Sequence, residues 1–205
     1  MRNPLTLAVV LLLTVGGFRA AQAAPIVAVD TDPGTPGVQS SSDLFDIASF
    51  SVDIVISGVE ASAPLQGFEF DLDFDPVLLV AVSVVDGGFL LAPTFVVQND
   101  IGVMSVEFAE LTLLPAGASG SGVLATIGFD VIGDGTSALD LNDVVLAAPF
   151  GVPIATAGIF DGAVSVGKNP IPEPTADLLF GVGLICVAFD LSRRRRFIPQ
   201  STNHE

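Results

Sequence analysis

Strict alternation of apolar and polar side chains in the middle of the chain is the feature that most limits its fold. Every second residue of segment 68–74 is apolar: Phe68, Phe70, Leu72 and Phe74. The residues between and after them are acidic: Glu69, Asp71, Asp73 and Asp75. Successive side chains of a β-strand point to opposite faces, so this segment predicts a strand with one core face and one solvated face. Residues 50–57 alternate in the same way, with Phe50, Val52, Ile54 and Ile56 on the core face.

More segments of this kind follow, and turn residues separate them. The further strands that we expect are Leu79–Val85, Thr94–Val97, Val103–Phe108, Gly122–Ile132, Ser137–Val145 and Gly162–Val166. The turns that we expect lie at Asp86-Gly87-Gly88, Asn99-Asp100, Ala116–Gly122 and Gly133-Asp134-Gly135. Short strands with short connections and no helical pattern between them predict an all-β, antiparallel two-sheet sandwich. Residues 30–44, rich in Pro, Gly and Ser, are expected to form a linker or a long first connection.

The N-terminus has the pattern of a secretory signal peptide. Arg2 precedes an apolar run over 5–15, and Ala21-Gln22-Ala23 offers the small residues of a cleavage site. We expect cleavage after Ala23, because cleavage after Ala24 would leave Pro25 directly behind the scissile bond. The alternative is an uncleaved anchor helix. Residues 1–23 are therefore assigned as a signal peptide and residues 24–167 as one folded domain.

The C-terminus combines three elements in order: Pro172-Glu173-Pro174, an apolar stretch over 178–189, and Arg193, Arg194, Arg195 and Arg196. The apolar stretch is shorter than the ~20 residues that a spanning helix needs, and residues 175–192 reach that length with polar residues at the interfaces. The arginines orient such a helix with residues 193–205 in the cytoplasm and the domain outside. Residues 168–174 are the expected spacer, and a buried amphipathic helix is the alternative for 175–192.

This order of elements resembles the PEP-CTERM sorting signal of Gram-negative bacteria. The resemblance implies that a membrane-embedded exosortase-type protease cuts near Pro172-Glu173-Pro174. The protein would then be exported, held in the inner membrane as a precursor, and delivered to the cell surface or the extracellular matrix.

Composition excludes several classes of function. Residues 24–170 contain no Arg, His, Cys, Tyr or Trp, and Lys168 is their only basic residue. The formal charge of the chain is −16 although its arginines lie in the two terminal segments, so the domain alone is more acidic and would repel nucleic acid. His204 and Cys186 lie in the C-terminal segments, which excludes Ser-His and Cys-His catalysis by the domain and predicts a non-enzyme. Glycoside hydrolysis by two of the carboxylates Glu69, Glu107 and Glu110 is a remote alternative.

Several segments of the domain look like those of a cohesin-type domain, over most of residues 26–166. Residues 50–56 look like its early strand, and 65–78 like the following strand, which ends in Asp75-Pro76-Val77-Leu78. Residues 122–131 and 161–166 look like its late strands. The resemblance implies a jelly-roll sandwich of about nine strands, a dockerin as partner, and a relation to carbohydrate-binding modules.

Two acidic features raise the question of calcium. The segment Asp130-Val131-Ile132-Gly133-Asp134-Gly135 with Asp140 is similar to an EF-hand-like loop, but Ile132 and Leu141 occupy ligand positions, which favours two strands around a Gly-Asp-Gly turn. The row Glu69, Asp71, Asp73 and Asp75 places like charges about 7 Å apart. It is either a solvated outer face or a calcium site; otherwise we expect no cofactor.

We therefore expect a non-enzymatic surface or matrix protein that presents an interaction domain. The alternative is a polysaccharide-binding module, with or without calcium, whose ligand would be an exopolysaccharide. A protein partner predicts an apolar patch on a sheet face, and Val55 with the exposed faces of the late strands is where we expect it.

Overall fold

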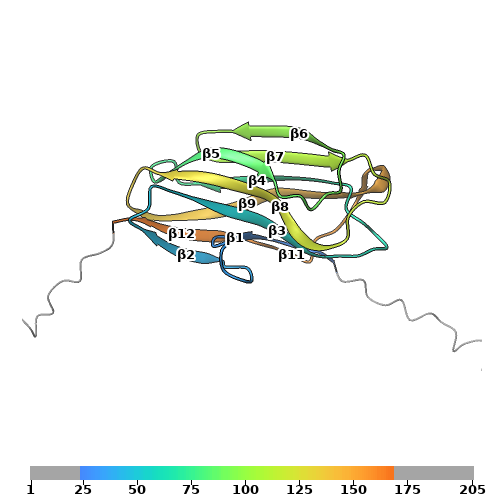
Figure 1. Cartoon of the computed structure of the whole chain (residues 1–205), viewed down its shortest axis with the longest axis horizontal. Helices are drawn as coiled ribbons and strands as arrows, with labels where there is room; N and C mark the ends of the chain where they lie inside the picture. The colour runs from blue at the N-terminus through green and yellow to red at the C-terminus, as the bar shows by residue number, and fades with distance from the viewer. Residues whose placement is uncertain (1–23, 169–205) are drawn as a thin grey trace, which may run out of the picture. The chain divides into compact units, whose positions relative to one another are not determined.

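The structure of the chain is a computed structural model that describes residues 24–168. Its strands form two stacked sheets, with the core between them (Figure 1). The five-stranded sheet has the order β11 (Gly158–Phe160), β1 (Ile26–Asp30), β3 (Ser49–Val59), β8 (Gly120–Val131), β5 (Leu79–Asp86). The seven-stranded sheet has the order β2 (Ser41–Phe45), β12 (Gly162–Gly167), β9 (Gly135–Ala148), β4 (Gly67–Phe74), β7 (Ser105–Thr112), β6 (Thr94–Ile101), and β10 (Val152–Pro153) pairs with β9. A short 3-10 helix, η1 (Pro149–Gly151), follows β9.

The predicted alternation is confirmed on both strands that suggested it. On β3, Val52, Ile54 and Ile56 are buried. On β4 the four apolar residues are all buried, and Phe74 meets Phe129 of β8 edge to face at 5.1 Å between ring centroids. The two sheets are thus held together by side chains that the period of two assigns to the core.

The all-β sandwich is confirmed, and each predicted strand is present with somewhat different ends. The structure adds β1, β2, β10 and β11 to them, and it places β2 inside the expected linker 30–44. Four of the five residues of β1 are buried, so this strand shows no alternation in the sequence. The pairings β1–β11 and β2–β12 are parallel, whereas the other pairings are antiparallel.

Two turn predictions need correction. Asn99 and Asp100 lie within β6, and the chain reverses after it, where the Gly102 N–H donates to the Ser105 carbonyl at 2.8 Å. Gly133 and Asp134 do separate two strands, but β8 and β9 belong to different sheets. The Gly-Asp-Gly segment is therefore a crossover between sheets, not a hairpin.

The described core lies within one compact unit, which ends at Lys168. The described chain enters the sandwich at one end and leaves it at the other (Figure 1). No helix within residues 24–168 is long and apolar enough to span a membrane. The predicted signal peptide with Ala21 and Ala23, Pro172-Glu173-Pro174, and the segments 175–192 and 193–205 lie outside the described residues.

Candidate functional site

The outer face of the seven-stranded sheet changes from apolar at one end of its strands to acidic at the other. Cross-strand pairing across β9, β4, β7 and β6 arranges its outward residues in rows. The rows are Ala147, Gly67, Leu111 and Phe95; Val145, Glu69, Ala109 and Gln98; Asn142, Asp71, Glu107 and Asp100; and Asp140, Asp73 and Ser105. We call this surface, from its apolar first row to its acidic last row, the mixed face.

The apolar end of the mixed face is a shallow depression of about 220 Å³. Leu111 and Ala109 of β7 form part of it, and Val145 of β9 and Val97 of β6 flank it with 51% and 64% of their surfaces exposed. Apolar side chains on rigid strands can be desolvated by a partner with little loss of conformational entropy. This end therefore suits an apolar contact.

The acidic end is built around Asp71. Its partners across the two neighbouring strands are Glu107 of β7 and Asn142 of β9. A β-bulge in β9 inserts one extra residue here, Asp143, whose φ is 48°. The Asn142 side-chain amide donates to an Asp73 carboxylate oxygen at 3.1 Å, and the Gln98 amide donates to Glu107. Two amides thus hold two of the carboxylates in place.

The charge at this end is only partly relieved. Partial burial raises the pKa of Asp71 above its usual range, and the nearby carboxylates of Glu107, Asp143, Glu69 and Asp73 raise it further. Since no Lys or Arg of residues 24–167 is available to pair with them, the repulsion stays until a proton or a positive group from outside approaches. A Lys or Arg side chain of a partner would find a favourable potential here.

The prediction that Glu69, Asp71 and Asp73 point to the outer face is confirmed. The placement of Asp75 in the same row is wrong. Asp75 follows the end of β4, and its carboxylate accepts the Val77 N–H at 2.9 Å, while its carbonyl accepts the N–H groups of Leu78 and Leu79. Asp75 therefore holds the Asp-Pro turn that leads into β5.

Within residues 24–168, no group of three or more Asp, Glu, His or Cys side chains is arranged to hold a metal ion. The carboxylates of the mixed face form rows along and across strands and do not converge on one point. Calcium binding by Glu69, Asp71 and Asp73 therefore stays a prediction that needs a direct measurement.

The three glutamates proposed for glycoside hydrolysis do not face a common site. Glu69 and Glu107 lie on the mixed face, whereas Glu110 points into the sandwich and is 1% exposed. Adjacent positions of a strand face opposite sides, so the β-sheet itself separates Glu110 from the other two. A hydrolytic pair would therefore have to be Glu69 and Glu107, on an open sheet face.

The loop similar to an EF-hand is part of the sheet crossover. Asp130 lies on β8 and Asp140 on β9, in different sheets. One carboxylate oxygen of Asp134 accepts the Lys168 backbone N–H at 3.1 Å. The Gly-Asp-Gly segment does lie between two strands, but β8 and β9 do not pair with each other, so the expected strand pair is wrong. Asp134 has a structural role in this crossover.

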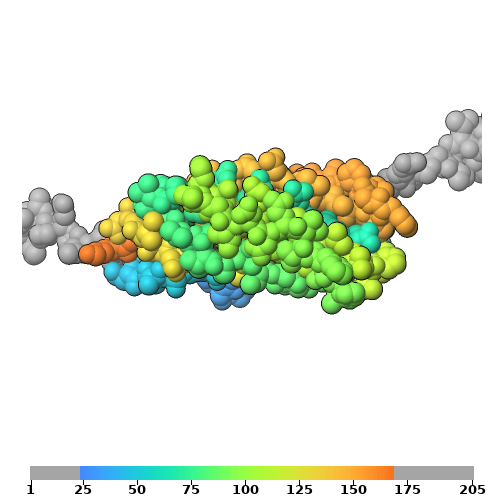
Figure 2. All heavy atoms as spheres, turned by 90° about the horizontal axis from the view of Figure 1, so that it is seen from above, coloured from blue at the N-terminus to red at the C-terminus, as the bar shows by residue number. Residues whose placement is uncertain are grey.

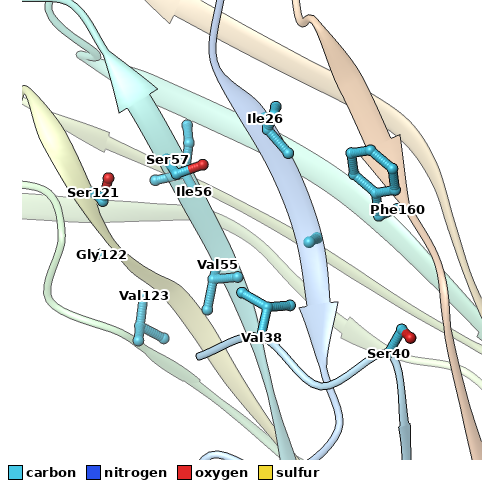
Figure 3. Close-up of a pocket in the computed structure, with 11 residues that line it drawn as sticks. Ile26, Val38, Ser40, Val55, Ile56, Ser57, Ser121, Gly122, Val123 and Phe160 are labelled. Atoms are coloured by element: carbon cyan, nitrogen blue, oxygen red, sulfur yellow. The ribbon is translucent and has the colours of Figure 1, made fainter. Parts of the chain in front are cut away.

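The five-stranded sheet carries a second surface feature, an apolar groove of about 560 Å³. Val55 of β3 and Val123 of β8 lie on its floor, Val38 of the β1–β2 connection lies above them, and the ring of Phe160 on β11 stands at the opposite rim (Figure 3). None of the residues that line it is charged. The prediction of an apolar patch at Val55 is confirmed as a structural feature.

The sequence pattern did not place Asp100, Asp140, Asn142 and Asp143 on the same face as Asp71. The signal was present for two of them, since Asp140 and Asn142 alternate with Leu139 and Leu141. Their meeting with Asp71 depends on which strands are neighbours, and the alternation does not give that. Glu110 could have been placed inside, because it continues the inward series Val106, Phe108 of β7.

Comparisons with known proteins agree with this architecture. A family model described as Cohesin domain matches residues 48–166. A non-cellulosomal cohesin from Archaeoglobus fulgidus is 16% identical, with a TM-score of 0.52 over 70% of this chain and 91% of that one. The seventh ScaB type I cohesin of Pseudobacteroides cellulosolvens is also 16% identical, with a TM-score of 0.55 over 74% and 97% of the two chains.

A third similar structure was solved with its partner. It is the Coh-OlpC–Doc435 cohesin–dockerin complex from Clostridium thermocellum, 12% identical, with a TM-score of 0.56 over 72% of this chain and 96% of that one. At these identities the solved structures show a shared fold. No curated protein sequence matches this chain at a significant level.

Proposed function

Because this chain belongs to the cohesin domain family, we propose that its domain is a non-enzymatic interaction module that binds a dockerin-type protein through the mixed face. The observation that carries this assignment is the gradient of the mixed face, from the apolar rows at Leu111 and Val145 to the acidic row at Asp71 and Glu107. One end offers apolar contact area, and the other offers unpaired negative charge.

A protein partner fits this gradient better than a polysaccharide does. Protein interfaces combine an apolar centre with a polar, charge-complementary rim. Sugar rings are commonly bound by stacking on Trp or Tyr, and the chain contains neither residue. The expected partner surface presents a Lys or Arg to Asp71 and an aliphatic side chain to the depression near Leu111.

Charge reversal of the mixed face tests this assignment. The dockerin domains of the source organism, each expressed singly, serve as probes in biolayer interferometry against immobilised residues 24–168. We expect Asp71→Lys to weaken binding at least tenfold, about 1.4 kcal/mol, mainly by slowing association at low salt. The matched control is Asp130→Lys on the outer face of the five-stranded sheet, which makes the same change in net charge.

An equal loss of affinity in both variants would mean that only net charge matters and would contradict binding at the mixed face. The second candidate function, polysaccharide binding, predicts a different outcome. No dockerin would bind, and the host exopolysaccharide would retard the domain in affinity electrophoresis, with or without a requirement for calcium.

Delivery to the cell surface is the second part of the proposed function. A compact unit ends at Lys168, and Pro172-Glu173-Pro174 follows it in the sequence after three residues, a spacing that supports cleavage there by a membrane protease of the exosortase type. The charge asymmetry between Arg193–Arg196 and the acidic domain supports an orientation with the domain outside.

Replacement of Pro172, Glu173 and Pro174 by Ala in the native host tests the sorting motif. We expect the variant to stay in the membrane fraction at full length, whereas wild-type surface material lacks Phe197–Glu205 by mass spectrometry. The matched control replaces Ser201, Thr202 and Asn203 by Ala and should be processed normally. Surface protein that still carries Phe197–Glu205 would contradict cleavage near Pro172.

A further inference from the structure

Glu110 is a buried carboxyl group without a hydrogen-bond partner of normal geometry. Its residue is 1% exposed, and neither of its side-chain oxygens accepts a hydrogen bond. The other buried acidic residue, Asp30, is satisfied, because its carboxylate accepts the backbone N–H groups of Asp32 at 3.2 Å and Gln39 at 3.0 Å. An ionised carboxylate at this position would destabilise the folded chain, because no hydrogen-bond donor of normal geometry replaces the water that it loses on burial.

No basic side chain is placed to neutralise Glu110. Lys168 is the sole basic residue of the described chain, and it follows β12, which β9 and β4 separate from β7 in the sheet. An ion pair is therefore excluded within residues 24–168. Charge neutrality at Glu110 must come from a bound proton or from an external cation.

The groups around Glu110 favour protonation of its carboxyl group over binding of a cation. Its β-sheet partners are Phe68 of β4 and Val96 of β6, which do not titrate. The titratable group that faces it is Asp86 at the end of β5, and the Thr94 hydroxyl of β6 is also near. Burial is the main cause that raises the pKa of Glu110, and Asp86 raises it further, while Thr94 opposes the change.

From this arrangement we propose that Glu110 is protonated and donates a hydrogen bond to Asp86, and that this contact is an acid-stabilised latch between the two sheets. One Asp86 oxygen accepts the Gly88 N–H at 2.6 Å, which leaves its other oxygen for the Glu110 hydroxyl. Asp86 is exposed, so the proton can exchange with solvent. The latch needs no ligand.

The position of the latch gives it a structural consequence. The latch joins β7 to β5, and next to it the edge strands β5 and β6 of the two sheets are in contact, where the Asn99 side-chain amide donates to the Val84 carbonyl at 3.4 Å. Side chains of β5 and β6 close this side of the domain (Figure 2). Ionisation of Glu110 would draw its carboxylate toward water between these two edges and loosen β6.

The direction of the pH effect follows from the raised pKa of Glu110. Below pH 4.5, the ordinary value of the group, Glu110 is protonated in the folded and the unfolded chain, and the latch is fully present. As pH rises from there through the higher pKa of the folded state, the folded chain holds more protons than the unfolded one, so stability falls. Above that pKa the loss is complete and constant.

Thermal unfolding of residues 24–168 from pH 4 to pH 8, followed by circular dichroism, tests the latch. We expect the Tm of Glu110→Gln to exceed that of wild type by about 3–8 °C at pH 8, with the difference shrinking as pH falls toward 4. Glu60→Gln, at an exposed position, is the matched control and should keep the wild-type pH profile. Asp86→Asn should move the pH at which the Tm falls toward the ordinary range of a carboxyl group.

Two direct measurements complete the test. A carbon-13 titration of the wild-type Glu110 carboxyl should show a midpoint above 4.5, and amide hydrogen exchange of β6 and residues 87–93 should quicken above that midpoint. A midpoint in the ordinary range, or identical pH profiles for wild type and Glu110→Gln, would overturn the latch. If calcium raised the Tm of wild type at pH 8 but not that of Glu110→Gln, the carboxylates of Glu110 and Asp86 would bind a cation, and the latch would be overturned.

Discussion

Phe70→Ala is expected to lower the free energy of unfolding of residues 24–168 by about 3–5 kcal/mol. Phe70 is fully buried at the centre of β4, and its ring lies 6.2 Å from that of Phe68 and 6.1 Å from that of Phe108. Truncation removes both ring contacts and leaves a cavity that rigid neighbouring strands cannot close. Urea unfolding followed by far-ultraviolet circular dichroism is the suitable measurement, because the chain has no Trp or Tyr for fluorescence.

The matched control is Phe150→Ala. Phe150 is 98% exposed and has a φ of 68°, so Phe and Ala are equally strained there and the ring contacts little. Its replacement should change stability by less than about 0.5 kcal/mol. A similar, small effect for both variants would show that the Phe68–Phe70–Phe108 cluster is not the centre of the core.

The substitution Gly87→Asn is expected to destabilise the domain by about 1–3 kcal/mol. A Cβ at Gly87 would lie closer to the Val123 carbonyl of β8 than van der Waals contact allows. The backbone cannot shift easily, because the Gly87 N–H donates to the Leu124 carbonyl at 3.0 Å and the Phe89 N–H donates to the Val123 carbonyl at 3.2 Å. Chemical unfolding of Gly87→Asn against wild type measures the effect.

Gly88→Asn is the control that separates close packing from backbone conformation. Gly88 has a φ of 79°, but nothing lies within 4 Å of the place of its Cβ. Asn tolerates the left-handed region better than other non-glycine residues, so we expect a loss of less than about 1 kcal/mol. A larger loss at Gly88 than at Gly87 would mean that this turn requires glycine for its φ and not for its contact with β8.

The sequence was sufficient for features that depend on neighbours along the chain. Alternation placed Phe68, Phe70, Leu72 and Phe74 in the core and Glu69, Asp71 and Asp73 outside, because side-chain direction follows from the strand backbone itself. Turn chemistry located the interruption at residues 86–88. The same rules failed for β1, because residues on both of its faces are buried and its sequence does not alternate. They also ended the predicted strand at Phe108, whereas β7 continues to Thr112.

Pairing between distant segments decided what alternation could not. Asp71 faces Glu107 and Asn142 because β4 lies between β7 and β9, and the bulge at Asp143 adds a further carboxylate to this row. The split of β8 and β9 between two sheets turned an expected strand pair into a crossover. The closeness of Glu110 on β7 to Asp86 on the edge strand β5 likewise arises from the packing of one sheet on the other.

The sequence by itself thus determined the fold class, the acidity of the domain and the inward or outward direction of most strand residues. Tertiary structure alone decided which carboxylates share a face, which one is buried without a basic side chain beside it and where the apolar groove lies. The physical reason is range: the pleat of a strand is fixed by each residue and its neighbours, whereas sheet order and register are set by burying all apolar faces of the chain at once.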